Sequence, residues 1–371
     1  MKIGLCFNLK KEMESDAGDK AEPGGSKSLS NDIHQAVIPR DFYAECDSME
    51  TISAVRDALA ANNDVVLMEA DENCYGKFRA EKPDIVFNIA EGIYGTAREA
   101  HIPCMLEFLR IPYTGSDPLT LAICLDKQRT KEVLHYYDIP MPKSEIINSR
   151  KALKSLRKNT RGFFNLRNEH LKYPLMVKPV SEGSSKGIVN DAVVRNEKEL
   201  GIQISRVSEL YAQPALVEEY LPGREFTVAM LGNGKDARAL PIVEIIFDTL
   251  PEGVNHIYSY EAKWIWDVPE KPLDIFKCPA AIPAKLRKQI ESICVSAYNA
   301  LNCKDWSRID VRCDSEGNPN ILEINPLPGI LPNPEDNSCF PKAARTAGLS
   351  YGQLINNVLD AACARYGMAG I

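Results

Sequence analysis

Short apolar segments alternate with helical patterns over the first third of the chain, and this alternation restricts the fold more than any other feature. KIGLCF, DVVLME and DIVFNIA read as buried strands, while Ile52, Val55 and Leu59 have the spacing of a helix that starts at Asp47-Ser48. Strands separated by helices predict a parallel sheet that is covered on both faces. We expect this first α/β domain to span residues 1–117, because Pro and Gly break the pattern in IPYTGSD.

The rest of the chain mixes strands and helices without a visible repeat, and its length of 371 residues favours two or three domains. One helix is expected from about residue 118 to 137, followed by a Pro-rich junction in DIPMPKSEII. YPLMVKPV, GIVNDAVV and ALVEEYL are strand candidates around a helix at 200–210. EFTVAMLG, LPIVEIIF, SRIDVRCD and NILEINP are further strand candidates, with helices at 283–301 and 351–364. We predict a central lobe over 118–222 and a C-terminal lobe over 223–371.

Composition excludes several classes of function. A net charge of −7 argues against a nucleic-acid partner, and no apolar run approaches the ~20 residues that cross a membrane. The N-terminus lacks the pattern of a secretion signal, and the eleven cysteines stand singly without a CxxC pair. These features predict reduced thiols, no zinc site and a cytoplasmic protein. The polar segment 11–36 and the basic segment 159–172 are expected to be surface loops, and the sequence assigns them no role.

The sequence SRIDVRCDSEGNPNILEINPLPG predicts an antiparallel hairpin with a turn at DSEGN. Side chains alternate along a strand, so Arg308 and Asp310 share one face, and Glu323 and Asn325 share one face of the partner strand. Three converging oxygen ligands suit Mg²⁺, which keeps some positions for phosphates. The alternative is a surface hairpin with ordinary acidic residues. Apolar neighbours on the opposite face of the second strand favour the metal site.

A second motif, YPLMVKPVSEGSSKG, places Lys178 at the end of an apolar strand, where a buried lysine needs an anionic partner. The loop EGSSKG is rich in backbone donors and hydroxyls, which suits it to phosphates, although it is not a Walker loop and by itself is only a turn. LVEEYLPGREF ends a strand with paired acids and Pro-Gly, as in a hinge that contacts adenosine, or in a plain charged hairpin. Lys263 lies in the aromatic loop YSYEAKW, where a solvated lysine is the simpler interpretation.

Together these motifs resemble the ATP-grasp superfamily, and specifically the D-alanine–D-alanine ligases. The matching stretches run from FNIAEG to the C-terminus: IPYTGS, LDKQRTK, YPLMVKPVSEGSSKG, LVEEYLPGREFTVAMLG, YEAKW, RIDVR, LEINPLPG and SCFPKAARTAGLSYGQL. The resemblance implies an ATP-grasp fold, with an N-terminal parallel-sheet domain and two α+β lobes that clamp ATP. It also implies an enzyme that joins a small carboxylic acid to an amine in an ADP-forming reaction, and it suggests a homodimer.

The resemblance also implies a role for each matching residue. Residues Lys127, Lys178 and Lys263 would hold the ATP phosphates under the loop of Ser184 and Ser185. Adenine would bind at Glu218, Glu219 and Leu221, and the ribose at Glu225. Two Mg²⁺ ions, or Mn²⁺ in their place, would bind Asp310, Glu323 and Asn325. Arg308 and the backbone N–H of Gly329 would form an oxyanion hole, where one donor is worth roughly 100- to 1,000-fold in rate.

The substrate positions depart from the family. The Gly-Gly, Ser-x-Glu pattern after the first strand is absent, and Glu45 in FYAECDS is a possible substitute. Glu91 replaces the family's LHG histidine, which favours a cationic group in the acceptor amine or an ion pair with Arg98. Trp264 replaces a tyrosine and cannot accept its hydrogen bond. Ser338 is a further substrate candidate. We therefore expect a substrate other than D-alanine alone; the alternatives are a genuine cell-wall D-alanine–D-alanine ligase and an ATP-binding pseudoenzyme.

Overall fold

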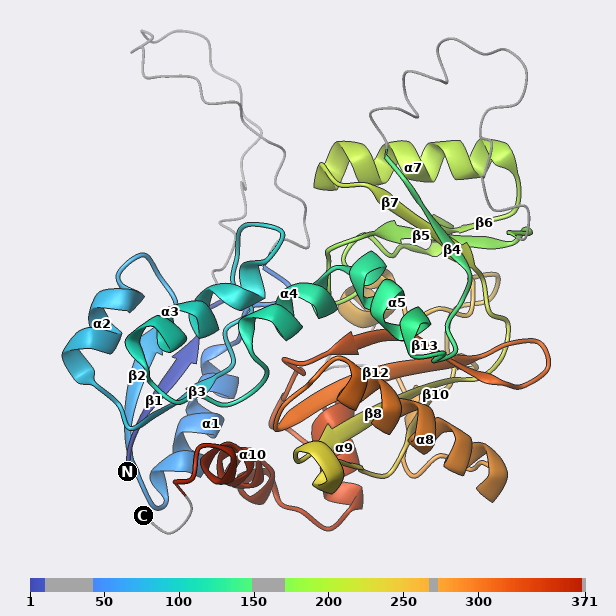
Figure 1. Ribbon diagram of the computed structural model, residues 1–371. Helices are drawn as coiled ribbons and strands as arrows, with labels where there is room; N and C mark the ends of the chain where they lie inside the picture. The colour runs from blue at the N-terminus through green and yellow to red at the C-terminus, as the bar shows by residue number, and fades with distance from the viewer. Residues whose placement is uncertain (11–42, 149–170, 267–272, 369–371) are drawn as a thin grey trace, which may run out of the picture.

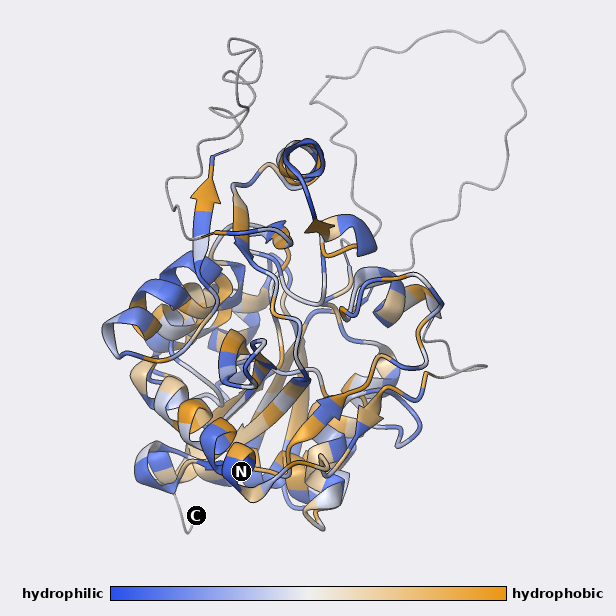
Figure 2. Ribbon diagram, turned by 90° about the vertical axis from the view of Figure 1, so that its right-hand side faces the viewer, coloured by the Kyte–Doolittle hydropathy of each residue, from blue (hydrophilic) through white to orange (hydrophobic). Residues whose placement is uncertain are grey.

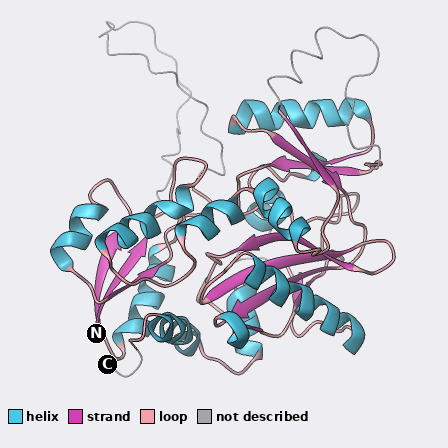
Figure 3. Cartoon of the chain, viewed as in Figure 1, coloured by secondary structure: helices cyan, strands magenta, loops and turns pink. Residues whose placement is uncertain are grey.

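Three β-sheets organise the chain, as Figures 1 and 3 show for a computed structural model that describes residues 1–10, 43–148, 171–266 and 273–368. The segment 11–36 lies outside the described residues, as does the segment 159–172 apart from its last two residues. No helix in the described ranges is both long and apolar enough to cross a membrane.

The first sheet is parallel, as predicted, with strand order β2-β1-β3. It contains β1 (Lys2–Phe7), β2 (Asp64–Glu69) and β3 (Ile85–Asn88), with the helices α1 (Met49–Ala60), α2 (Cys74–Glu81), η1 (Arg98–Ala100) and α3 (His101–Leu109) around it. Ser48 caps α1 by accepting a hydrogen bond from the backbone N–H of Thr51 at 3.2 Å. The prediction that DVVLME is buried is wrong: only Met68 is, because β2 is an edge strand with a neighbour on one side.

The second sheet is antiparallel and has the strand order β4-β7-β5-β6. Its strands are β4 (Ser144–Ile147), β5 (Leu175–Pro179), β6 (Val193–Val194) and β7 (Ala215–Glu219), and α7 (Glu197–Tyr211) covers one face. The sequence prediction needs two corrections. The Pro-rich junction contains a strand, β4, and GIVNDAVV supplies only two strand residues because the turn η2 (Asn190–Ala192) occupies its middle.

The third sheet has six strands in the order β11-β10-β8-β12-β13, with β9 paired to β8. They are β8 (Glu225–Leu231), β9 (Arg238–Ala239), β10 (Val243–Ile245), β11 (Phe276–Lys277), β12 (Trp306–Cys313) and β13 (Pro319–Asn325), and the turn η3 (Gly234–Asp236) follows β8. The helix α8 (Ala284–Ala300) packs on one face, and α9 (Cys339–Thr346), which was not predicted, packs on the other. The predicted hairpin is confirmed, with Arg308 opposite Asn325 and Asp310 opposite Glu323.

Two helices stand where one was predicted between residues 118 and 137. They are α4 (Pro118–Leu125) and α5 (Lys127–Tyr136), separated by Asp126, whose backbone is extended. The Asp126 carboxylate accepts hydrogen bonds from the N–H groups of Gln128 and Arg129 at 2.9 and 3.1 Å, so it caps α5. This break places Lys127 at the first residue of α5. Cys124 and Leu134 pack with α8 and the six-stranded sheet, which fixes the position of that lysine.

The last helix, α10 (Tyr351–Arg365), packs against α1 at the other end of the sequence. The Asn356 side chain donates a hydrogen bond to the backbone oxygen of Ala58 at 2.9 Å, and α10 lies beside α1 in Figure 1. Hydrophobic and hydrophilic residues alternate along the helices in Figure 2, as expected for helices that bury one face. The domain boundaries at residues 117 and 222 stay a prediction.

Candidate active site

Two adjoining cavities lie where the elements of the three sheets meet. The first cavity, about 890 Å³, is lined by residues of β5, β7, β8 and β12 such as Lys178, Glu218, Glu225 and Arg312. The second cavity, about 1290 Å³, adds residues of the N-terminal unit and of the segment after β13. The two share one wall, formed by Ser184, Tyr258, Lys263, Arg308, Glu323 and Cys339. Molecules bound in both cavities would therefore meet at this shared wall.

Lys178 and Glu218 line the first cavity near β5, and Lys131 contacts the same carboxylate. Glu218 Oε1 lies 2.6 Å from Lys178 Nζ, so the predicted anionic partner of Lys178 is confirmed, and Glu218 Oε2 lies 3.0 Å from Lys131 Nζ. Burial alone would raise the pKa of Glu218, but the two lysines outweigh it and lower that pKa. The group keeps one net positive charge at a buried position, which suits an anionic ligand. Sequence reasoning missed Lys131, although it lies four residues after Lys127 on the same helix.

The residues predicted to hold adenosine lie at the end of β7, in the turn that follows it and at the start of β8. Glu219 and Leu221 line the first cavity; the N–H of Glu219 donates to the Lys143 carbonyl at 3.0 Å, while the N–H of Leu221 has no hydrogen-bond partner in the described part of the chain. Glu225 is buried and lies 2.6 Å from Arg312, a residue that the sequence did not single out. Burial raises the pKa of Glu225, although Arg312 acts in the opposite direction.

The acidic face of the hairpin lies between cations. Arg308 donates to Asp310 at 2.9 and 3.1 Å and lies 3.7 Å from Glu323, and Lys127 Nζ lies 3.5 Å from Glu323 Oε2. Burial acts to raise the pKa of Glu323, yet Lys127, Lys178 and Arg308 lower it to about 2. Burial raises the pKa of Asp310, with Arg308 opposing and Glu323 adding to the rise. Glu323 is therefore held ionised.

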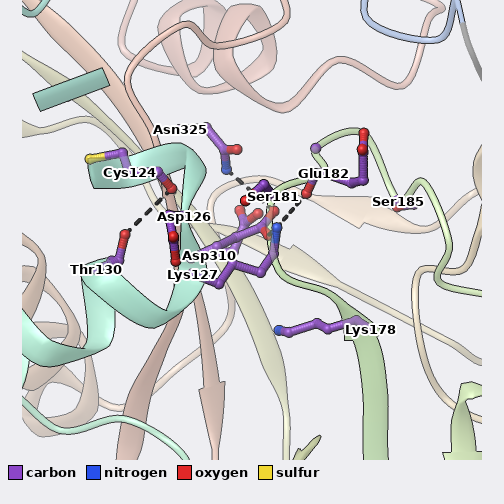
Figure 4. Close-up of polar contacts among 12 residues, drawn as sticks. Cys124, Asp126, Lys127, Thr130, Lys178, Ser181, Glu182, Ser185, Asp310 and Asn325 are labelled. Carbon is purple, nitrogen blue, oxygen red and sulfur yellow. Dashed lines mark hydrogen bonds and ion pairs between the residues drawn. The ribbon is translucent and has the colours of Figure 1, made fainter. Parts of the chain in front are cut away.

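These side chains fit Mg²⁺. Asp310, Glu323 and Asn325 offer oxygen atoms only, and the described residues contain no cluster of three His, Cys, Asp or Glu side chains that would form a closed metal cage. Asn325 Nδ2 points to Glu323 Oε1 at 3.4 Å, which leaves the amide oxygen of Asn325 for another ligand. A site with few protein oxygens is the kind that Mg²⁺ occupies together with phosphates and water. Figure 4 shows Lys127 and Lys178 entering the same space beside Asp310.

The loop EGSSKG, residues 182–187 and called the Gly-Ser loop below, is hydrogen-bonded to several other segments. Ser184 and Ser185 have left-handed backbone conformations, with φ of 49° and 60°. Ser185 Oγ donates to the carbonyl of Tyr258 at 2.9 Å, so it joins this loop to the segment that carries Lys263. Lys127 Nζ donates to the carbonyl of Glu182, as Figure 4 shows. The loop thus bridges α5 and the Lys263 segment over the shared wall.

Lys263 is the second residue of the π-helical turn η4 (Ala262–Trp266), and it lines both cavities. Burial and the charge of Arg308 lower the pKa of Lys263. The side chain of Trp264 lies outside the described part, so the predicted loss of a hydrogen-bond network there stays a prediction.

The segment after β13 brings Gly329 and Ser338 into the second cavity beside Arg308. Ser338 Oγ accepts from the N–H of Leu331 at 3.2 Å and donates to the carbonyl of Gly329 at 3.3 Å. Ser338 is buried and thereby holds the shape of this segment. The geometry brings the two predicted oxyanion donors to one cavity, and their role stays a prediction.

Glu45 forms the centre of a buried charge cluster rather than standing alone. Its carboxylate accepts hydrogen bonds from Arg98 and Lys186, both at 2.9 Å, and from the N–H of Gly183 at 2.9 Å. Arg98 also lies 3.4 Å from Glu182. Of the two alternatives for Glu91, the ion pair with Arg98 is not formed among the described residues, where Arg98 is engaged by Glu45 and Glu182.

Comparison with known proteins identifies the class of this chain. The family model described as the D-ala D-ala ligase C-terminus matches residues 133–360. An uncharacterized protein of Sinorhizobium fredii is 38% identical, over 79% of this chain and 78% of that protein. The D-alanine–D-alanine ligase of Bordetella avium is 36% identical, over 75% of this chain and 78% of that protein.

Two solved structures share the fold. The D-alanine–D-alanine ligase of Bacillus anthracis complexed with ATP has a TM-score of 0.66 at 22% identity, over all of both chains. The VanG D-Ala:D-Ser ligase of Enterococcus faecalis has a TM-score of 0.64 at 22% identity, over 97% of this chain and 99% of that one. The fold is therefore the predicted ATP-grasp α/β fold.

The chain belongs to the D-alanine–D-alanine ligase family of ATP-grasp enzymes, which are ATP-dependent, ADP-forming ligases that join a carboxylate to an amine. Membership implies ATP and Mg²⁺ as cofactors and small molecules as substrates. The cytoplasmic location stays a prediction.

Proposed function

We propose that this ligase activates a small carboxylic acid, an amino acid, as an acyl phosphate and couples it to an amine to give a dipeptide or amide, with a substrate other than D-alanine alone. The observation that carries the proposal is the shared wall, where Arg308, Glu323 and Lys263 face both cavities. A nucleotide in the first cavity and an acid in the second would meet there. Holding two reactants in this way accelerates a reaction chiefly by positioning them.

ATP is assigned to the first cavity. Leu221 offers to the adenine a backbone N–H that no described residue accepts, beside Glu218 and Glu219, and Glu225 lies at the cavity wall where a ribose hydroxyl would bind. Lys178 lines this cavity from β5, and Lys127 lies in the adjoining second cavity beside Glu323 of the shared wall, where the phosphates would lie. Ser184 and Ser185 offer hydroxyl groups and nearby backbone N–H donors above them.

Mg²⁺ would be held by Asp310, Glu323 and Asn325, and we propose two ions, which Mn²⁺ can replace. When bound, the metal ions neutralise charge on the phosphoryl group that is transferred. The protein adds Lys127, Lys178 and Lys263 around the same group. The lowered pKa of Lys263 results from burial and from Arg308, and an arriving phosphate would stabilise its charged form.

The reaction has two steps. First, a carboxylate oxygen of the acid attacks the γ-phosphorus, a C–O–P linkage forms, the bond to the β-phosphate oxygen breaks and ADP leaves. Second, the neutral amine attacks the acyl carbon, the C–O bond to phosphate breaks, and the amine proton leaves with phosphate or to solvent. Arg308 and the N–H of Gly329 line the second cavity and would stabilise the oxyanion of this step. The Gly-Ser loop would exclude water from the acyl phosphate.

A D-alanine–D-alanine ligase of cell-wall precursor synthesis is the second candidate, favoured by the name of the Bordetella relative. Glu91 in the second cavity distinguishes the two, since it places an acid beside the substrate where the family has a histidine. An ATP-binding pseudoenzyme is the third and least favoured, because the acidic and basic groups of the shared wall are all present.

The test is a screen of paired amino acids for release of ADP and phosphate with Mg-ATP. We expect turnover with at least one pair other than D-alanine with itself; activity with D-alanine alone would refute the substrate proposal. Glu323→Gln should reduce turnover at least about 100-fold, because the loss of outer partners of a metal site alone costs about 10- to 100-fold. The matched control is Glu316→Gln, an exposed acid in the turn of the same hairpin, which should leave turnover unchanged. Equal turnover in both variants would contradict the metal assignment, and ATP binding without any turnover would support the pseudoenzyme.

The resemblance to the family also supports a homodimer. Light scattering of the purified protein would measure a mass near twice 41.3 kDa if this is correct.

A further inference from the structure

Three carboxylates line the second cavity without an ion pair to any cation of the described residues. Asp47 precedes α1, Glu91 follows β3 and Glu99 lies in η1, so three separate elements bring them to one cavity. Glu99 is only 8% exposed, and within the described ranges its side chain makes no hydrogen bond or ion pair. A buried carboxylate that faces a cavity without a partner is costly, and such a group is expected to meet a ligand.

Three cations near these carboxylates, Arg98, Lys186 and Lys127, are engaged by other groups. Arg98 and Lys186 both lie 2.9 Å from Glu45, and Lys186 lies 2.7 Å from Glu182. Lys127 donates to the Glu182 carbonyl and lies 3.5 Å from Glu323. None of these ion pairs includes the three carboxylates. Lys10 also lines the cavity, and one lysine against three acids leaves surplus negative charge when the acids are ionised.

The surplus charge changes how these acids ionise. Burial raises the pKa of Glu99 to about 8, with Arg98 opposing and Glu45 adding to the rise. Burial also raises the pKa of Glu91, and repulsion from Glu45, Glu99 and Asp47 raises it further. Burial raises the pKa of Asp47 to about 7. A cation placed among them would remove the repulsion and allow all three to ionise.

We propose that Asp47, Glu91 and Glu99 form a subsite for a cationic side chain of the substrate, so that one substrate of this ligase is an amino acid with a second amino group or a guanidino group. The inference rests on the proposed function, because it assigns a substrate class to the same cavity. One carboxylate would be enough to match a single ammonium group. Three carboxylates on three separate elements suit a diamino acid, whose two positive charges lie several bonds apart.

The experiment compares cationic amino acids with neutral ones of similar shape. The pairs are ornithine with norvaline and lysine with norleucine, each in both configurations, measured as kcat/KM for ADP release with a panel of partner amines and acids. We expect at least one cationic member to exceed its neutral match about 30-fold or more, since breaking a buried charge pair commonly costs that much. Equal values within each pair would overturn the proposal, even if the ligase reaction itself is observed.

The variants Glu99→Gln and Glu91→Gln remove one charge each and keep nearly the same shape. We expect each to reduce the cationic preference at least about tenfold. Glu72→Gln, an exposed acid of the same N-terminal unit, is the matched control and should leave the preference unchanged. A preference that survives in both subsite variants would assign the recognition elsewhere and overturn the proposal.

Direct binding separates this inference from the proposed function. The melting temperature of the protein is measured with Mg-ADP and with ornithine or norvaline added. If no amino-acid pair releases ADP, the proposed function fails, and the binding result still decides the subsite. An upward shift with ornithine alone that is lost in Glu99→Gln supports the subsite, and equal shifts with both amino acids refute it.

Discussion

Replacement of Glu45 by Gln tests the buried cluster that joins the N-terminal unit to the Gly-Ser loop. The substitution keeps the shape of the side chain but removes the charge that Arg98 and Lys186 approach at 2.9 Å. All three side chains are less than 10% exposed, so water cannot replace the lost partner. Removal of one partner from a buried ion pair costs about 3–5 kcal/mol. Because Glu182 remains within 3.4 Å of Arg98 and 2.7 Å of Lys186, we expect a value at the lower end, about 3 kcal/mol.

The assay is hydrogen exchange of the loop amides together with urea unfolding. The N–H of Gly183 donates to Glu45 at 2.9 Å, so its protection reports directly on the contact. A loss of about 3 kcal/mol corresponds to exchange roughly 100-fold faster if the loop opens locally. The matched control is Glu72→Gln, an exposed acid for which no such change is expected.

A double variant adds a second criterion. Glu45→Gln combined with Arg98→Met removes both charges, and a coupling free energy of about 1 kcal/mol or more between the two changes is expected for side chains in contact. The reasoning is refuted if Glu45→Gln changes the free energy of unfolding by less than about 0.5 kcal/mol, the range of an ordinary surface substitution, and leaves the exchange of Gly183 unaltered.

Three further predictions follow from the described contacts. The pKa of Glu99 is raised from 4.5 to about 8, so its contribution to stability is present below pH 4.5 and is lost as the pH rises to about 8; Glu99→Gln should flatten that fall in urea titrations, and an unchanged pH slope would contradict the shift. Asp305 is fully buried, lies 2.8 Å from Arg365 and accepts a hydrogen bond from the N–H of Gly115. Asp305→Asn should therefore lower the free energy of unfolding in urea by about 3 kcal/mol. A change below about 1 kcal/mol would argue against the role of Asp305 in joining α10 to the first unit. Asn196 caps α7 by accepting from the N–H of Glu199 at 3.0 Å, and Asn196→Ala should cost about 1 kcal/mol without altering turnover, as unfolding and ADP-release measurements would show.

Local patterns in the sequence predicted the parts of the fold that depend on neighbouring residues. The alternation in β12 and β13 predicted that Arg308 and Asp310 share one face and that Glu323 and Asn325 share one face of the partner strand, because a strand repeats every two residues. The register, with Arg308 opposite Asn325 and Asp310 opposite Glu323, came from the structure. The spacing of Ile52, Val55 and Leu59 predicted the buried face of α1 for the equivalent reason in a helix.

Other features could not be predicted because they arise from distant parts of the chain. The edge position of β2 depends on which strands β1 accepts as neighbours, so apolar composition alone gave a wrong burial. The break at Asp126 has a local signal in the capping aspartate, but the packing of α4 and α5 against α8 and the six-stranded sheet depends on distant residues. Helix α9 is too short for its apolar residues to show a clear helical repeat, and its buried face is defined by its packing on β8.

The candidate site shows the same division. By itself the sequence determined which chemical groups are available: lysines at strand and helix ends, a loop rich in Gly and Ser, and a hairpin with one acidic face. Only the tertiary structure decided which charges neutralise each other. Glu218 pairs with Lys131 and Lys178. Glu45 pairs with Arg98, which is 53 residues away in the sequence, and with Lys186, which is 141 residues away. Those pairings leave the buried Glu99 without a hydrogen bond or ion pair to any described residue. The physical reason is that Coulomb interactions follow distance in space and burial, and neither quantity is written in the spacing of residues along the chain.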